Sequence, residues 1–264
     1  MIDIHHHLLY GLDDGPADRE AAIALAEAAI DDGITHVVCT PHANTKYKFN
    51  PQINRERAAD IKAAVGNRLH IGLGCDFHLS FENIEQCLIE PSRYTINGGG
   101  YLLVEFSDFG PPPNISEIFF QLMVKGVRPI ITHPERNPVF QSKPEGLTNW
   151  LRIGCLMQVT AGSLAGRFGN RAEKTAWKML EKNWVQFVAT DAHSVERRPP
   201  CLSGAWRAID SRFGRKVADR LCIENPRAAF ENQELGPQPE PEGIHVLPEE
   251  AKKPGLLARL FGRR

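Results

Sequence analysis

The segment Ile2-Asp3-Ile4-His5-His6-His7 begins a pattern that recurs along the chain: a short strand-like run whose downstream end carries polar side chains. Similar runs follow at 36–39, 69–73, 101–106, 128–132, 156–160 and 185–190. Helix-length segments are found at 18–32, 51–65, 115–125, 147–153, 170–182 and 203–223. Strands that alternate with helices in this way indicate an α/β fold with a parallel sheet. Six or seven regularly spaced strands favour a β/α barrel over an open sheet.

Composition narrows the class of protein. The 264 residues are 42% hydrophobic and 24% charged, which excludes a disordered or fibrous chain. The net charge of −1 argues against a nucleic-acid backbone as the main partner. Six cysteines form no C-x-x-C pair, and the first residues lack the basic and apolar regions of a signal peptide. These features predict a soluble, cytoplasmic protein in a reducing compartment.

A change of composition at Gly236 predicts two regions, a domain over 1–235 and a tail over 236–264. The sequence GPQPEPEG at 236–243 is expected to be an acidic, Pro-rich linker that does not pack on the domain. Beyond it, residues 252–264 are basic and place Leu256, Leu257, Leu260 and Phe261 on one helical face. This flexible tail either docks on an anionic membrane or partner groove, or is a frayed, exposed end.

Histidines and acids follow the predicted strands. His5 and His7 share one side of a strand because residues two apart point the same way. A carboxylate such as Glu105, inside an apolar run, is costly to bury unless it is paired or binds a metal. The carboxyl ends of barrel strands converge on one face, so these side chains are expected to form one site. The candidate metal ligands are His5, His7, Asp14, His42, Asp76, Glu105, His133, Asp191 and His193.

Nine such ligands are too many for one ion, and bridging carboxylates let two or three ions share a pocket. Mixed imidazole and carboxylate ligation suits Zn, Mn or Fe. Arg136 comes three residues after His133, and Arg197 and Arg198 come shortly after His193. Guanidinium groups bind phosphate bidentately. Metals and arginines in one cleft predict the hydrolysis of a phosphate ester, with Arg136 and Arg198 binding the phosphate.

Several motifs together resemble the PHP (polymerase and histidinol phosphatase) superfamily. They are Asp3-Ile4-His5-His6-His7, Asp13-Asp14-Gly15, Thr40-Pro41-His42 and Val104-Glu105-Phe106. Four later motifs narrow the resemblance: Thr132-His133-Pro134-Glu135-Arg136, Thr190-Asp191-Ala192-His193, Arg198-Pro199-Pro200 and Glu224-Asn225-Pro226. They are similar to the bacterial manganese-dependent protein-tyrosine phosphatases of capsule and exopolysaccharide synthesis. The resemblance extends from residue 1 to about 230.

The resemblance implies a distorted (β/α)7 TIM-like barrel (the PHP fold) that binds two to three divalent ions, with Mn favoured and Fe or Zn as alternatives. The implied substrate is the phosphotyrosine tail of a membrane-bound tyrosine autokinase. The implied ligand sets are His5, His7 and Asp191; Glu105 and His133; and Asp14, His42 and His193. Asp76 stands where the family usually has a bridging Glu, which is one methylene longer. His78 is a candidate to compensate, and His42 is a candidate proton donor.

Other functions remain open at this stage. The runner-up is a small-molecule PHP phosphatase acting on a substrate such as histidinol phosphate, and a PHP-type exonuclease is disfavoured by the neutral charge. The segment Cys201-Leu202-Ser203-Gly204-Ala205-Trp206-Arg207 also fits C-x-x-G-x-x-R, the loop of cysteine-dependent tyrosine phosphatases. That chemistry needs a strand before the cysteine, and none is predicted there. A fourth interpretation is a metal-stabilised scaffold that binds a kinase through its basic tail.

Overall fold

The computed structural model describes residues 1–244, and all its strand pairs are parallel. The strands of this part are β1 (Ile2–His6), β2 (His36–Cys39), β3 (His42–Ala43), β4 (His70–Leu73), β5 (Asp76–His78), β6 (Tyr101–Glu105), β7 (Arg128–Thr132), β8 (Leu156–Thr160) and β9 (Phe187–Ala189). One sheet has the order β1-β2-β4, and the other has the order β3-β5-β6-β7-β8-β9. The predicted α/β fold with parallel strands is therefore confirmed.

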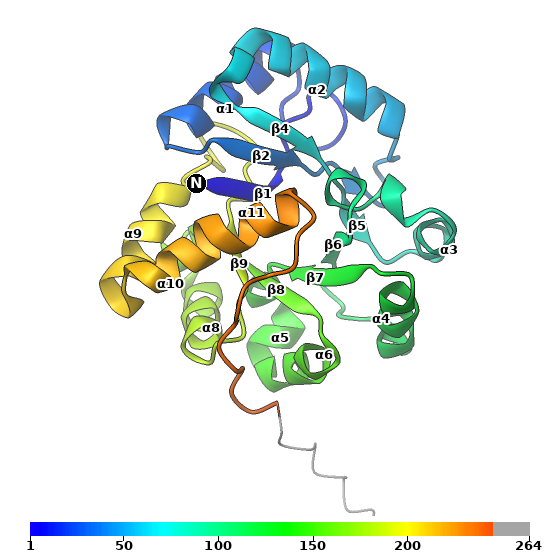
Figure 1. Cartoon of the computed structure of the whole chain (residues 1–264), viewed down its shortest axis with the longest axis vertical. Helices are drawn as coiled ribbons and strands as arrows, with labels where there is room; N and C mark the ends of the chain where they lie inside the picture. Colours follow the sequence, from blue (N-terminus) through cyan, green and yellow to red (C-terminus); the bar gives the residue numbers. More distant parts are fainter. Residues whose placement is uncertain (245–264) are drawn as a thin grey trace, which may run out of the picture.

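Helices surround the strands (Figure 1). The α-helices of the described part are α1 (Arg19–Asp31), α2 (Pro51–Val65), α3 (Phe81–Ile89), α4 (Ile115–Val124), α5 (Pro138–Ser142), α6 (Thr148–Ile153), α7 (Ala161–Leu164), α8 (Asn170–Glu181), α9 (Leu202–Phe213), α10 (Arg215–Asp219) and α11 (Asn225–Phe230). A π-helical turn, Arg220–Glu224, joins α10 to α11. No helix in residues 1–244 combines the length and the apolar character needed to cross a membrane.

The two sheets are linked at both sides. Pro41 separates β2 from β3, and Gly74-Cys75 separates β4 from β5, but the backbone N–H of Asp76 still donates to the carbonyl of Pro41 across these breaks (3.2 Å). On the other side, a parallel bridge pairs His6 of β1 with Ala192, just after β9. Because the strands are parallel, their carboxyl ends lie at the same end of the molecule.

Local sequence explains where the helices begin and end. The side chain of Asn50 accepts the N–H groups of Gln52 and Ile53, and Pro51 occupies the first turn of α2, where its missing N–H costs nothing. The helix ends at Gly66, whose φ of 64° lies in the left-handed region that glycine adopts without strain. The predicted bounds of 51–65 are confirmed.

A buried carboxylate ties the first strand to the last. Asp3 is fully buried, and it accepts hydrogen bonds from the backbone N–H of Thr190 (3.0 Å) and from the Thr190 hydroxyl. Burial raises the pKa of Asp3 to about 6, although these hydrogen bonds oppose the rise. The contact fixes the end of β9, from which Asp191 and His193 extend, beside the strand that carries His5 and His7.

The prediction that 236–243 does not pack is wrong. The indole N–H of Trp184 donates to the carbonyl of Glu242 (2.7 Å), and the guanidinium of Arg152 donates to the carbonyl of Ile244 (2.6 Å). Gln238 exchanges two hydrogen bonds with the buried amide of Asn225 (2.8 and 3.0 Å). An extended chain leaves its carbonyls free, so buried donors on the domain can bind it. Figure 1 shows this segment crossing the lower part of the molecule.

Two further differences concern helices. The single helix expected over 203–223 is broken at Gly214, which has a φ of 87° and separates α9 from α10. Helix α3 was not predicted; it is short, and its first and last residues, Phe81 and Ile89, are exposed. The tail predicted over 252–264 lies outside the described residues.

Candidate metal centre

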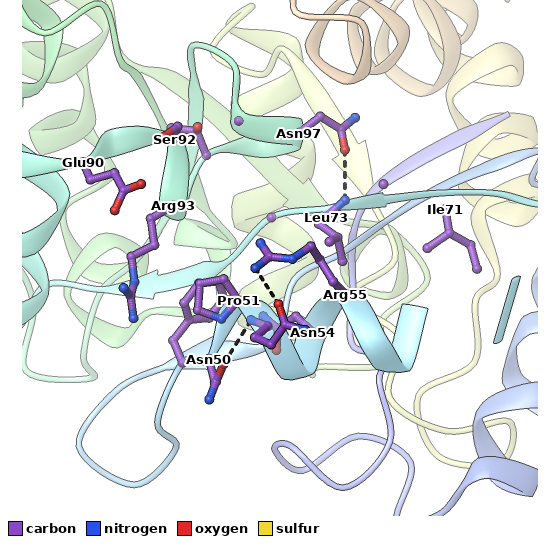
Figure 2. Close-up of a pocket in the computed structure, with 16 residues that line it drawn as sticks. Asn50, Pro51, Asn54, Arg55, Ile71, Leu73, Glu90, Ser92, Arg93 and Asn97 are labelled. Carbon is purple, nitrogen blue, oxygen red and sulfur yellow. Dashed lines mark hydrogen bonds between the residues drawn. The ribbon is translucent and has the colours of Figure 1, made fainter. Parts of the chain in front are cut away.

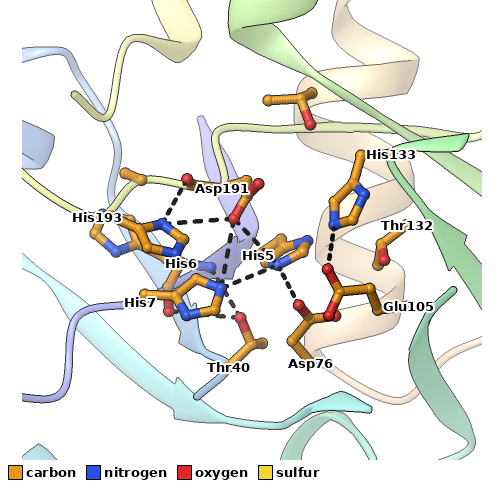
Figure 3. A network of polar contacts seen from close by, with 12 residues as sticks. His5, His6, His7, Thr40, Asp76, Glu105, Thr132, His133, Asp191 and His193 are labelled. Atoms are coloured by element: carbon orange, nitrogen blue, oxygen red, sulfur yellow. Dashed lines mark hydrogen bonds and ion pairs between the residues drawn. The ribbon is translucent and has the colours of Figure 1, made fainter. Parts of the chain in front are cut away.

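All nine predicted ligands lie together at the carboxyl ends of the strands. Figure 3 shows His5, His7, Asp76, Glu105, His133, Asp191 and His193 pointing toward one another from β1, β5, β6 and the ends of β7 and β9. His42 comes from β3, and Asp14 comes from the loop before α1. Most of these side chains are buried; those of His42, Glu105 and Asp14 are 13%, 21% and 50% exposed, which places the opening of the site at Asp14.

The ligand atoms form four overlapping groups, and within each group they lie within 4.8 Å of one another. The groups are His7, Asp14, His42 and His193; His5, His7 and Asp76; His5, His133 and Asp191; and His42, Asp76 and Glu105. This geometry keeps Asp14, His42 and His193 together, as the resemblance implies, and adds His7 to them. Asp76 belongs to two groups, which is the arrangement that a bridging carboxylate requires.

Buried polar atoms without partners show that these residues fit metal ions. Four ligand atoms are buried and have no hydrogen-bond partner: both carboxylate oxygens of Asp76, Nδ1 of His42 and Nε2 of His193. Asp76 Oδ2 lies 3.1 Å from His42 Nδ1 and 3.6 Å from His5 Nε2. Unsatisfied buried acceptors cost free energy, and coordination of a cation satisfies them. Imidazole and carboxylate donors suit divalent transition metals.

The charges of the group are strongly coupled. Burial lowers the pKa of His5, but Asp191 and Asp76 more than offset this effect and raise that pKa to about 9. Burial would raise the pKa of Asp191, yet His5, His7 and two arginines hold it well below its usual range. Burial lowers the pKa of His193 to about 4. Asp191 therefore stays ionised and attracts positive charge into the site, whether a proton or a metal ion, whereas burial and the charge of Asp76 raise the pKa of Glu105.

Three hydrogen bonds orient the histidines. Nδ1 of His5 lies 2.8 Å from Oε1 of Gln158, and Nδ1 of His7 lies 2.8 Å from Oδ2 of Asp13. Nδ1 of His193 lies 2.9 Å from the carbonyl of Asp191. Such outer partners fix the ring and direct the other nitrogen at the metal. Sequence reasoning missed Gln158, although a polar amide inside the apolar run of β8 is a signal of the same kind as Glu105. It gave Asp13 no separate role.

Two arginines meet at one carboxylate. Arg136 and Arg198 both donate to Oδ2 of Asp191. The guanidinium of Arg136 also lies over the ring of Phe168, 4.3 Å from its centroid, which holds it in place by a cation–π contact. Both predicted phosphate-binding residues therefore border the metal-ligand groups.

Two of the candidate ligands have unusual backbone conformations. His133 has a φ of 35° and Asp191 a φ of 53°, in the left-handed region that residues other than glycine rarely adopt. Such strain persists only where the surrounding structure enforces it, and it concentrates at functional sites.

Cavities in the described residues differ in their chemistry. A cavity of about 470 Å³ is lined by Asp14, His193 and small residues of α1 and the loop before it, so it opens directly beside the candidate ligands. A larger cavity of about 800 Å³ lies elsewhere, between the start of α2, β4 and residues 90–98 (Figure 2). None of the candidate ligands lines the larger cavity.

Two other sequence-based candidates lie outside the ligand groups. Cys201 is exposed in the loop before α9, and no strand of the described part leads into it, since β9 ends at Ala189. This arrangement lacks the strand that a cysteine-dependent phosphatase loop requires. His78 belongs to none of the four groups, so the structure gives it no compensating place beside Asp76.

The fold and the site define an α/β protein with a candidate centre for several metal ions at the carboxyl ends of its strands. Residues 1–231 match the family model described as capsular polysaccharide synthesis, CpsB/CapC. The chain is 34% identical over 243 residues to the tyrosine-protein phosphatase YwqE of Bacillus subtilis, covering 90% of this chain and 95% of YwqE. It is 28% identical over 242 residues to the tyrosine-protein phosphatase CpsB of Streptococcus pneumoniae, covering 88% and 99%. The chain belongs to the CpsB/CapC family, as the sequence motifs predicted.

Solved structures agree with this assignment. A crystal structure from work on YwqE of B. subtilis and CpsB of S. pneumoniae, described as unique metal-dependent tyrosine phosphatases, matches with a TM-score of 0.84 and 34% identity. The match covers 91% of this chain and 99% of that one. A lactonase of Listeria monocytogenes matches with a TM-score of 0.57 at 12% identity, covering 88% of this chain and 95% of the lactonase, which shows likeness of fold alone.

Proposed function

We propose that this chain is a metal-dependent protein-tyrosine phosphatase that binds two or three divalent ions, manganese first among them. The observation that carries the proposal is the convergence of nine imidazole and carboxylate ligands beside two arginines. The tyrosine-phosphatase names of relatives that share nearly the whole chain support the reaction. Such a site would need no covalent phospho-enzyme, because metal ions can activate water as the nucleophile.

The protein's part is to hold ions and substrate. When bound, divalent ions lower the pKa of a coordinated water and offset charge on a phosphoryl group. His5, His7, Asp14, His42, Asp76, Glu105, His133, Asp191 and His193 would hold them. Asp76 belongs to two of the ligand groups, so it would serve two ions, the bridging role that the family resemblance assigns to a Glu at this position.

Arg136 and Arg198 would bind the phosphoryl oxygens. Their guanidinium groups reach the same carboxylate oxygen of Asp191, so a phosphoryl group beside Asp191 lies within reach of both. Such fixed positive charge stabilises the transition state because it needs no reorganisation. The leaving phenol has a pKa near 10, so it needs little help from an acid. Both ring nitrogens of His42 face ligand carboxylates, Nε2 toward Asp14 and Nδ1 toward Asp76 and Glu105, so we assign His42 to metal binding rather than to proton donation.

The substrate we propose is the phosphotyrosine tail of a membrane tyrosine autokinase, and the process is the control of exopolysaccharide or capsule synthesis on the cytoplasmic side. The family's description in terms of capsular polysaccharide synthesis supports this setting. An open rim at Asp14 suits a side chain presented by a peptide.

We also infer that the two sheets close into one distorted (β/α)7 barrel. If β2 and β3 count as one interrupted strand, and β4 and β5 as another, the nine strands reduce to seven. The bridge between His6 and Ala192 then joins the first of them to the last. Closure explains why ligands from both sheets reach one site.

The test measures p-nitrophenyl phosphate and phosphotyrosyl-peptide hydrolysis before and after chelation, with elemental analysis of the purified protein. We expect activity to disappear with the metal and to return with Mn²⁺. His5→Ala should bind less metal and lose at least about a hundredfold in kcat, while its circular dichroism stays native. Faster turnover of histidinol phosphate than of the peptide would replace the proposed substrate. Full activity in the chelated protein would refute the metal assignment.

A further inference from the structure

A small basic pocket adjoins the metal-ligand groups and has no place in the mechanism above. Its volume is about 110 Å³, and its walls come from α7, the loop after it, residues 197–201 and the first turn of α9. Arg198 and Phe168 belong to this wall, and they also contact Asp191 and Arg136 at the phosphate-binding position. The pocket therefore lies next to the place where the scissile phosphate would bind.

The charged residues that line the pocket are all positive. Arg167, Arg197 and Arg198 line it, and no Asp or Glu is among the residues of its wall. Arg167 and Arg197 are exposed, and no ion pair within residues 1–244 engages either guanidinium. Unpaired guanidinium groups around one small space attract an anionic group.

Hydrogen bonds and close packing hold the backbone that carries these arginines. The hydroxyl of Ser194 accepts the backbone N–H groups of Arg197 (3.1 Å) and Arg198 (3.3 Å), which closes the loop that carries them. Across the pocket, a Cβ at Gly162 would lie 3.3 Å from Cδ of Arg167 and 3.1 Å from the ring of Phe168. The absence of a side chain at Gly162 lets the stem of Arg167 pack against α7. The arginines are thus attached to ordered backbone.

We propose that this pocket is a second anion subsite, which binds a carboxylate or phosphoryl group on a residue next to the scissile phosphotyrosine. The proposal rests on the proposed function, and it makes the substrate class an acidic or multiply phosphorylated peptide. A space of 110 Å³ equals roughly the share of three or four water molecules, which suits a small charged group. Arg197 also lines the cavity beside Asp14 and His193, so a peptide there can reach both spaces.

The test compares three peptides that differ in one neighbour of the phosphotyrosine: alanine, glutamate or a second phosphotyrosine, placed on either side. We expect kcat/KM to be about three- to tenfold higher for the acidic peptides than for the alanine peptide. In the double variant Arg167→Gln/Arg197→Gln this preference should fall to about one. Arg171→Gln, a matched exposed arginine on α8 outside the pocket, should keep it. The ratio of kcat/KM between the glutamate and phosphotyrosine peptides shows whether the pocket prefers a carboxylate or a phosphoryl group.

A binding measurement supports the kinetics. The same peptides are prepared with a non-hydrolysable phosphonate in place of the scissile phosphate. The acidic peptides should bind more tightly than the alanine peptide. The difference should disappear in Arg167→Gln/Arg197→Gln and remain in Arg171→Gln. Equal kcat/KM for acidic and neutral peptides in the wild-type protein, or an equal loss of preference in Arg171→Gln, would overturn the subsite. Failure of the wild-type protein to hydrolyse p-nitrophenyl phosphate with Mn²⁺ would instead overturn the proposed function, and the subsite with it.

Discussion

His5 and His7 face each other through their ring nitrogens, with the two Nε2 atoms 3.3 Å apart. Their opposite nitrogens lie 2.8 Å from the acceptor oxygens of Gln158 and Asp13, which assigns the ring protons to Nδ1. In the fully deprotonated pair both Nε2 atoms present lone pairs to the same space, and they repel unless a proton or a metal ion lies between them. The pair is therefore arranged to share positive charge, carried by a proton on His5 when no metal is bound or by a coordinated ion.

Gln158→Leu should weaken metal binding without changing the fold. The substitution removes the acceptor that orients His5, and loss of such a partner lowers metal affinity about 10- to 100-fold. Equilibrium dialysis against Mn²⁺ measures the effect, with the exposed residue Gln121 on α4 replaced in the same way as a control. Unchanged affinity in Gln158→Leu would mean that the hydrogen bond does not position the ligand.

Metal binding should release protons and strengthen as pH rises. Without metal, the carboxylates raise the pKa of His5 to about 9, so its ring carries a proton at pH 7.5 that coordination must displace. If binding releases one proton, the affinity for the metal should therefore fall about tenfold for each pH unit below 9. Calorimetry in two buffers of different ionisation enthalpy counts the protons. A pH-independent affinity between pH 6 and 8 would contradict the assignment.

Arg136→Lys should reduce kcat/KM for aryl phosphates by about tenfold or more, because a lysine ammonium cannot reproduce the bidentate guanidinium fork. The substitution also loses the contact with Phe168, 4.3 Å from the guanidinium. Steady-state kinetics with saturating Mn²⁺ give the effect, and bound metal should stay unchanged. Arg171→Lys on α8 is the matched control. Reduced metal content in Arg136→Lys would assign the loss to the centre instead of phosphate binding.

Gln238→Ala should destabilise the protein by about 1–2 kcal/mol, since it leaves the buried amide of Asn225 without two partners. Urea unfolding measures the loss, and Gln233→Ala, at an exposed position, is the control. Equal stability of both variants would mean that the two hydrogen bonds between Gln238 and Asn225 contribute nothing to stability.

The sequence predicted elements whose signals are local. Helix α2 has its cap at Asn50 and its stop at Gly66, and strand β7 was predicted at its observed bounds, Arg128–Thr132. Most of the candidate ligands were predicted because they are polar residues at or just after the end of an apolar run; Glu105 was predicted as a carboxylate inside such a run, and Asp14 as an acid downstream of His5 and His7. That signal does not depend on the strand breaks at Pro41 and Gly74, which the sequence pattern did not reveal.

Features that depend on distant partners could not be predicted in this way. Gln158 gains its role from His5, 153 positions earlier in the chain. The packing of residues 236–244 depends on donors such as Trp184, which a Pro-rich composition does not indicate. Which candidate ligands lie close together, such as His7 and Asp14, likewise depends on how the ends of several strands meet in the fold.

Cys201→Ser should keep the full aryl-phosphatase activity in the presence of Mn²⁺. The thiol lies in an exposed loop after Pro200, and β9 ends well before it, so the strand-to-helix geometry of a thiolate nucleophile is missing. Cys201 does line the small basic pocket, and a serine keeps that wall close in size. The assay is kcat for p-nitrophenyl phosphate with and without a chelator. A loss of a hundredfold or more in Cys201→Ser, together with resistance of the wild type to chelation, would support a cysteine mechanism instead.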